Sequence, residues 1–156
     1  MSSLRLALVA AVAVVLAIVP AGCDWSMGPP ASCALVTVEV RGGECVGGPC
    51  DTAVILDHDG RVHAAAKPPN DLGVVPPAEV DILEKLVATA DYGTIKSQPF
   101  TGQCPTAFDG QEVVIDFATS AGIQHIASCE TDVDWGNPLF VALSAALGPF
   151  IPLPAT

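Results

Sequence analysis

The chain has 156 residues, a length that suits one domain with a hydrophobic core of its own. Its 17 acidic residues against 6 basic ones give a formal net charge of −11 at pH 7. Proteins that bind nucleic acid concentrate Lys and Arg on one face, so this balance argues against DNA or RNA as a partner. It argues equally against a basic patch for anionic lipid headgroups, so attachment to a membrane would require a covalent anchor.

The first residues have the pattern of an export signal. Arg5 precedes an unbroken apolar run, residues 6–19, which is shorter than the roughly 20 residues that span a bilayer. Its length is typical of the core of a signal peptide. Pro20 ends the run, and two small residues then precede Cys23. We therefore predict that the protein is exported and that residues 1–22 are its signal peptide.

Residues 20–23 resemble the lipobox of bacterial lipoproteins, in which small residues stand directly before a cysteine. In that family the thiol of this cysteine receives diacylglycerol. The cysteine becomes the first residue of the mature protein, on the extracytoplasmic side of the cell membrane. The resemblance implies lipid attachment at Cys23, with residues 23–32 as anchor and tether. Pro20 departs from the family, which usually has Leu there. The same stretch also satisfies the small-x-small rule of the ordinary signal peptidase, and cleavage before Gly22 would release a soluble secreted protein.

Cysteines at six positions suggest a disulfide framework, because an exported protein meets oxidising conditions. Cys45 and Cys50 enclose a turn-forming stretch between two strand-like runs, so we predict a disulfide that closes this turn. Cys104 and Cys129 flank a predicted hairpin whose ends return to the same side of the sheet, so we predict a second disulfide there. Closing a loop of that size stabilises the fold by roughly 3.5 kcal/mol in the chain-entropy model.

This local pairing leaves Cys33 over. Lipidation of Cys23 would leave an odd number of cysteines, whereas simple secretion would let all of them pair, for instance Cys23 with Cys33. Cys45 and Cys50 could also form half of a zinc clamp, but Cys104 and Cys129 are too far apart in sequence to supply the other half.

Strand patterns occur five times in the mature chain. Alternating apolar and polar residues, or short apolar runs bounded by turns, predict strands at residues 35–41, 52–57, 61–65, 112–118 and 122–128. Asp59-Gly60 supplies the positive φ that a tight hairpin turn needs. Residues 119–122 supply the turn of the second hairpin.

Two segments, residues 77–91 and 138–147, have the spacing of amphipathic helices. Their ends are marked by Pro77 and Gly93 in the first helix and by Asn137, Pro138 and Gly148 in the second. Loops are expected at residues 67–76, 94–108 and 130–135, and an extended Pro-rich tail at residues 149–156.

The order of elements indicates the fold class. Strands joined by short turns pair antiparallel, and two amphipathic helices can cover one apolar face of their sheet. We therefore predict one α+β domain over residues 33–148, with about five antiparallel strands, two helices packed on one face, and disulfide bracing.

The mature part resembles a bacterial family of small, uncharacterised, cysteine-containing domains found in exported proteins and lipoproteins. The features that carry the resemblance are the strand at residues 36–40, the pair Cys45 and Cys50, Asp59-Gly60, the first helix, and the hairpin between Cys104 and Cys129. Four residues separate the first cysteine pair where the family has three, and Asp51 follows where the family has Pro. The family has no assigned activity, so the resemblance implies architecture and no chemistry.

One cluster suggests a metal site. Asp57, His58, Asp59 and His63 could converge across a hairpin, and two histidines with two carboxylates would suit zinc or copper. Turn chemistry also produces Asp-x-Asp-Gly at a hairpin tip, and His63 would then lie on an exposed strand face. We prefer the turn interpretation and assign no metal ligand.

No catalytic or cofactor-binding residue is assigned either. The chain contains no Gly-x-Ser-x-Gly elbow and no Gly-rich phosphate loop, and His125 lies within a strand without an evident nucleophile. The acidic side chains of residues 130–134 are expected to be solvated.

These observations favour a non-catalytic cell-envelope lipoprotein, anchored through Cys23, that binds an envelope protein or helps to maintain the cell surface. The alternatives are a soluble secreted or protease-inhibitor-like module using a braced loop such as residues 94–108, and a small extracytoplasmic enzyme or metal-binding protein using His58 and His63. If the function is binding, the exposed loops are the candidate surfaces. Trp135 is expected to anchor the final helix in the core, with an interface hot spot as the alternative.

Overall fold

A computed structural model describes residues 33–45, 48–49, 51–66 and 68–154. The predictions of a signal peptide, of lipid attachment at Cys23, of the tether and of the Cys45–Cys50 disulfide therefore lie outside the described residues and side chains.

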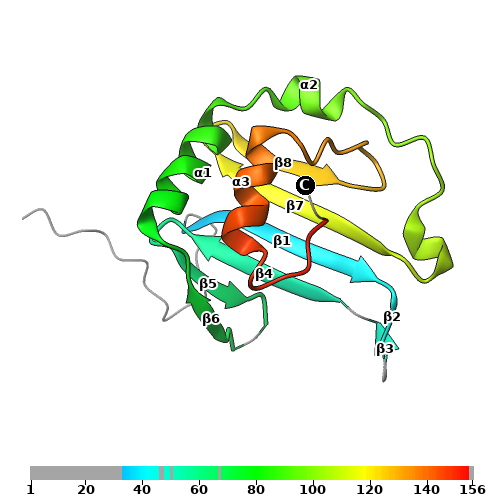
Figure 1. The fold of residues 1–156 in the computed structure, drawn as a ribbon, viewed down its shortest axis with the longest axis horizontal. Coiled ribbons are helices and arrows are strands. Elements are labelled where there is room, and N and C mark those ends of the chain that lie inside the picture. The colour runs from blue at the N-terminus through cyan, green and yellow to red at the C-terminus, as the bar shows by residue number, and fades with distance from the viewer. Residues whose placement is uncertain (1–32, 46–47, 50, 67, 155–156) are drawn as a thin grey trace, which may run out of the picture.

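The centre of the protein is an antiparallel sheet of six strands in the order β6-β5-β4-β1-β7-β8 (Figure 1). The strands are β1 (Ala34–Gly42), β4 (Thr52–Asp57), β5 (Arg61–Ala64), β6 (Asp71–Val74), β7 (Gln111–Thr119) and β8 (Gly122–Ala127). A separate two-stranded ribbon pairs β2 (Glu44–Cys45) with β3 (Gly48–Pro49). The predicted α+β class and antiparallel pairing are confirmed.

Strand β1 lies at the centre of this sheet, and its alternating sequence determines which face is buried. Val36, Val38 and Val40 are at most 1% exposed and point into the core. Strand β1 pairs with β4 on one side and β7 on the other, both antiparallel. Because side chains alternate along a strand, Thr37 and Glu39 lie on the opposite face, where both are half-buried.

Helices α1 (Pro77–Thr89) and α3 (Pro138–Leu147) lie across one face of the sheet, as Figure 1 shows. They bury Val80, Leu83 and Val87 from α1 and Leu139, Phe140, Leu143, Ala146 and Leu147 from α3. The bounds of α3 are as predicted, because local signals determine them. Asn137 Oδ1 accepts a hydrogen bond from the Leu139 N–H at 3.0 Å, Pro138 occupies the first turn, and Gly148 ends the helix.

The sheet has six strands and not five, because β6 forms within the segment predicted to be a Pro-rich loop. Its sequence, Asp-Leu-Gly-Val, is only four residues long and contains Gly, and its two alternating apolar residues, Leu72 and Val74, are exposed, so the local pattern is too weak to indicate a strand. Tertiary packing supplies the reason for the strand. A Cβ atom on Gly73 would lie 2.7 Å from Cε1 of Phe150, so the absence of a side chain lets this edge strand approach the C-terminal segment.

The helices and loops also differ from prediction in detail. Helix α1 ends at Thr89 because Ala90 is extended (φ −62°, ψ 140°), and Gly93 lies inside a further short helix, α2 (Tyr92–Lys96). A 3-10 turn, Pro105–Phe108, also forms within residues 94–108. The C-terminal segment, expected to be extended, begins with a turn that buries Ile151. No helix in the described part of the chain is long and apolar enough to cross a membrane.

Candidate functional site

The four side chains that could have converged at the first hairpin do not form one cluster. His58 Nδ1 lies 2.5 Å from Oε1 of Glu84 on helix α1, and Asp59 pairs with Arg61, whose Nε is 3.3 Å from Oδ2. Asp57 and His63 approach each other instead. None of these three contacts brings three potential metal ligands together. In the described part of the chain, only Cys104, Glu112 and Cys129 form such a cluster, and their sulfurs are already joined as a disulfide.

Asp57 and His63 form a buried pair. His63 pairs in register with Ile55, on the face of the sheet that points away from the helices, and the prediction that it would be exposed there is wrong. Asp57 is 2% exposed and His63 is 1% exposed, with 3.4 Å between His63 Nε2 and Asp57 Oδ2. Burial raises the pKa of Asp57, and the adjacent imidazole opposes this shift. Strand alternation indicates which face a residue occupies but not what covers that face.

His125 also has a carboxylate partner. Asp116 of β7 lies opposite His125 of β8, and their Oδ1 and Nδ1 atoms are 2.7 Å apart with both side chains partly exposed. Sequence reasoning missed this pair, although the signal was present. A hairpin in which Thr119 pairs with Gly122 also pairs residue 116 with residue 125. The hydrogen-bond partners of His58 and His125 among the described residues are carboxylates, Glu84 and Asp116.

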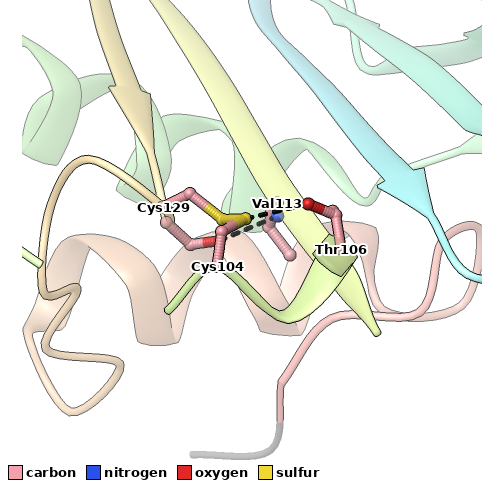
Figure 2. The surroundings of a disulfide bond; sticks show 5 residues. Cys104, Thr106, Val113 and Cys129 are labelled. Carbon is pink, nitrogen blue, oxygen red and sulfur yellow. Dashed lines mark hydrogen bonds between the residues drawn. A yellow bond between two sulfur atoms is a disulfide. The ribbon is translucent and has the colours of Figure 1, made fainter. Parts of the chain in front are cut away.

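Residues 94–108 and residues 130–135 were expected to be separate loops. They lie side by side and are joined to each other. The predicted disulfide between Cys104 and Cys129 is confirmed, with 5.2 Å between their Cα atoms. Figure 2 shows its surroundings. Cys104 Sγ lies 3.0 Å from Oγ1 of Thr106, and the Val113 N–H donates to Oγ of Ser128, the residue that follows β8, at 3.0 Å. Closer to α2, Pro99 and Thr131 form an isolated β-bridge.

Backbone hydrogen bonds on both sides of this bridge complete the junction. The Phe100 N–H donates to the Glu130 carbonyl at 3.0 Å, and the Asp132 N–H donates to the Gln98 carbonyl at 2.8 Å. The placement of the two segments beside each other therefore depends on non-local backbone pairing in addition to the disulfide.

A crevice lies where the joined segments meet α2 and the start of α3. Its volume is about 420 Å³, and it is lined by Thr94, Ile95, Gln98, Asp132, Val133, Asp134, Asn137 and Phe140. Phe140 is 1% exposed and belongs to the core, whereas Ile95 and Val133 are half-buried against it. A second cavity of about 250 Å³ shares Thr94, Ile95 and Asn137 with the first and continues toward the C-terminal end of α1.

Local capping interactions hold the walls of the crevice. Asp91 accepts hydrogen bonds from the Thr94 N–H at 3.0 Å and the Thr94 hydroxyl at 2.7 Å, which begins α2 and lowers the pKa of Asp91. Asp134 Oδ1 accepts from the Gly136 N–H at 2.9 Å. Lys96, the basic residue of α2, donates from Nζ to Gln124 Oε1 on β8 at 2.9 Å and does not line the crevice. None of the described residues that line it is basic.

Trp135 supports the crevice from the core side. Its half-buried ring lies 5.6 Å from that of Phe140, centroid to centroid, with the planes inclined at 57°. Phe140 is in turn 6.3 Å from Phe117. Trp135 therefore belongs to a chain of aromatic contacts that reaches the centre of the sheet, which favours the predicted core role over an exposed hot spot.

Cys33, which local pairing left over, is 5% exposed and disulfide-bonded. The sequence left the fate of Cys33 open, and that fate is a disulfide. The resemblance to exported cysteine-containing domains stays a prediction. Comparison of the chain with protein-family models and with curated proteins gives no match.

Proposed function

We propose that this protein is a non-catalytic binding module of the bacterial cell envelope. Its anchoring through lipid on Cys23 requires that Cys33, which is disulfide-bonded, pairs with Cys45 or Cys50, because Cys104 and Cys129 are already joined to each other. Its binding surface would be the crevice between α2 and residues 130–137. The observation that carries this proposal is the way the crevice is built. Two segments distant in sequence are closed around a cavity of about 420 Å³ by a disulfide, a β-bridge and two backbone hydrogen bonds.

This construction suits recognition. Binding loops held by a rigid scaffold lose little conformational entropy when a partner arrives, so more of the contact energy appears as affinity. The volume lies within the range of about 300–1,000 Å³ that is usual for ligand sites. The crevice also combines a buried apolar floor at Phe140 with polar groups at its rim, a composition typical of binding pockets.

The test is photo-crosslinking of the membrane-anchored protein in its native envelope. A photoreactive residue replaces Gln98, which lines the crevice, or Gln103, which is exposed on the same segment but lies outside the crevice lining. We expect a discrete crosslinked partner from position 98 and none from position 103. Thr94→Trp, which places a large side chain in the crevice, should abolish that product. Equal products at the two positions, or no product at position 98, would contradict the proposal.

A further inference from the structure

The two carboxylates at the rim of the crevice, Asp132 and Asp134, form no ion pair with a described residue. Outside the crevice, five carboxylates lie within ion-pair distance of an Arg or His side chain, whereas others, such as Asp81, form no ion pair with a described residue. Among the described residues, the ion pairs are Arg41–Glu39, His58–Glu84, Arg61–Asp59, His63–Asp57 and His125–Asp116. None of them includes a residue that lines the crevice. The described residues that line the crevice include these two carboxylates and no basic side chain, so the rim carries net negative charge.

We infer that the occupant of the crevice is a Lys or Arg side chain of a partner polypeptide, an inference that rests on the proposed function. Asp132 and Asp134 are both exposed at the rim, above the apolar Ile95 and Val133 and the buried Phe140. Asp134 uses Oδ1 to cap Gly136, whereas Asp132 makes no side-chain hydrogen bond to a described residue. The charge and the apolar floor therefore face the same space.

A long basic side chain matches both features at once. Lys and Arg place their aliphatic stems on apolar surface and keep their charged ends at a polar rim. A hydrogen bond from an ammonium or guanidinium group to a carboxylate is roughly twice as strong as a neutral one. The crevice would accept the stem over Ile95 and the charge beside Asp132.

Other occupants fit the crevice less well. A lipid headgroup or a nucleic acid carries phosphate, which the rim carboxylates repel. An inorganic cation would gain nothing from the apolar floor. A neutral apolar side chain would fill the floor but would leave the rim charge without a partner. The combination selects a cationic side chain on a polypeptide.

The test uses an array of immobilised hexapeptides probed with the purified, disulfide-intact mature protein. We expect the retained peptides to be enriched in Lys and Arg, and replacement of the critical Arg by neutral citrulline to reduce the signal at least tenfold. Asp132→Asn should reduce the signal of the same peptides about tenfold. Asp81→Asn is the matched control, because it makes the same charge change at an exposed position on α1 outside the crevice lining, and it should leave the signal unchanged.

Three outcomes overturn the inference: no retained peptide, retained peptides without basic enrichment, or equal signals from Asp132→Asn and the parent. Unchanged circular dichroism and melting temperature show that each variant is folded. The envelope crosslink at position 98 is an independent result. If it forms and also survives Asp132→Asn, the crevice binds a partner, but not through a cation.

Discussion

Replacement of Trp135 by Ala separates a packing role from an interface role. Truncation of a fully buried aromatic side chain typically costs about 3–5 kcal/mol. Trp135 is half-buried, and its ring contact with Phe140 is worth about 0.5–1.5 kcal/mol beyond area burial. We therefore expect Trp135→Ala to lower the free energy of unfolding by about 2–3 kcal/mol, since the partial exposure reduces the fully buried value. For a domain of this size that corresponds to a decrease in melting temperature of roughly 10 °C.

Urea unfolding followed by far-ultraviolet circular dichroism measures this loss. Phe108→Ala is the control, because Phe108 is 68% exposed and its truncation should change stability by less than about 0.5 kcal/mol. A double-mutant cycle with Phe140→Leu should show coupling between the two rings. If Trp135→Ala unfolds like the parent but no longer gives the crosslink at position 98, Trp135 is an interface residue and the packing argument fails.

Three further predictions address the disulfides, the buried acid and the anchor. The double variant Cys104→Ala/Cys129→Ala should lose about 2–4 kcal/mol in stability and the crevice crosslink; unchanged crosslinking would show that backbone pairing alone holds the two segments. Because the folded-state pKa of Asp57 is raised above the ordinary value of 3.8, the folded protein takes up the proton more readily, and its stability should fall as pH rises above 3.8. The free energy of unfolding of Asp57→Asn, measured in urea, should therefore rise relative to that of the parent between pH 3.5 and pH 6.5. A difference in unfolding free energy that stays constant over this range would contradict the raised pKa. Cys23→Ser should abolish labelling by a fatty-acid analogue in expressing cells, whereas a Cys23–Cys33 peptide in non-reducing mapping would exclude the anchor, because a thiol in a disulfide cannot carry diacylglycerol.

Several features of the fold follow from local sequence, because the interactions that form them lie within a few residues. Asn137 and Pro138 begin α3 through a side-chain cap and a preset φ, and Gly148 ends it. The valines of β1 mark the buried face through strict alternation. The β7–β8 turn fixes the register that brings Cys104 and Cys129 to the same end of the hairpin, so their disulfide could be predicted.

Other features depend on contacts that no local pattern contains. Strand β6 is too short to be recognised, and it forms because β5 and the ring of Phe150 are beside it. The burial of His63 depends on what covers its face of the sheet, which alternation does not encode. The loops at residues 94–108 and 130–135 could be identified as candidate surfaces one at a time. Their union into a crevice required the β-bridge between Pro99 and Thr131, because a site made from two distant segments exists only once backbone pairing has brought them together.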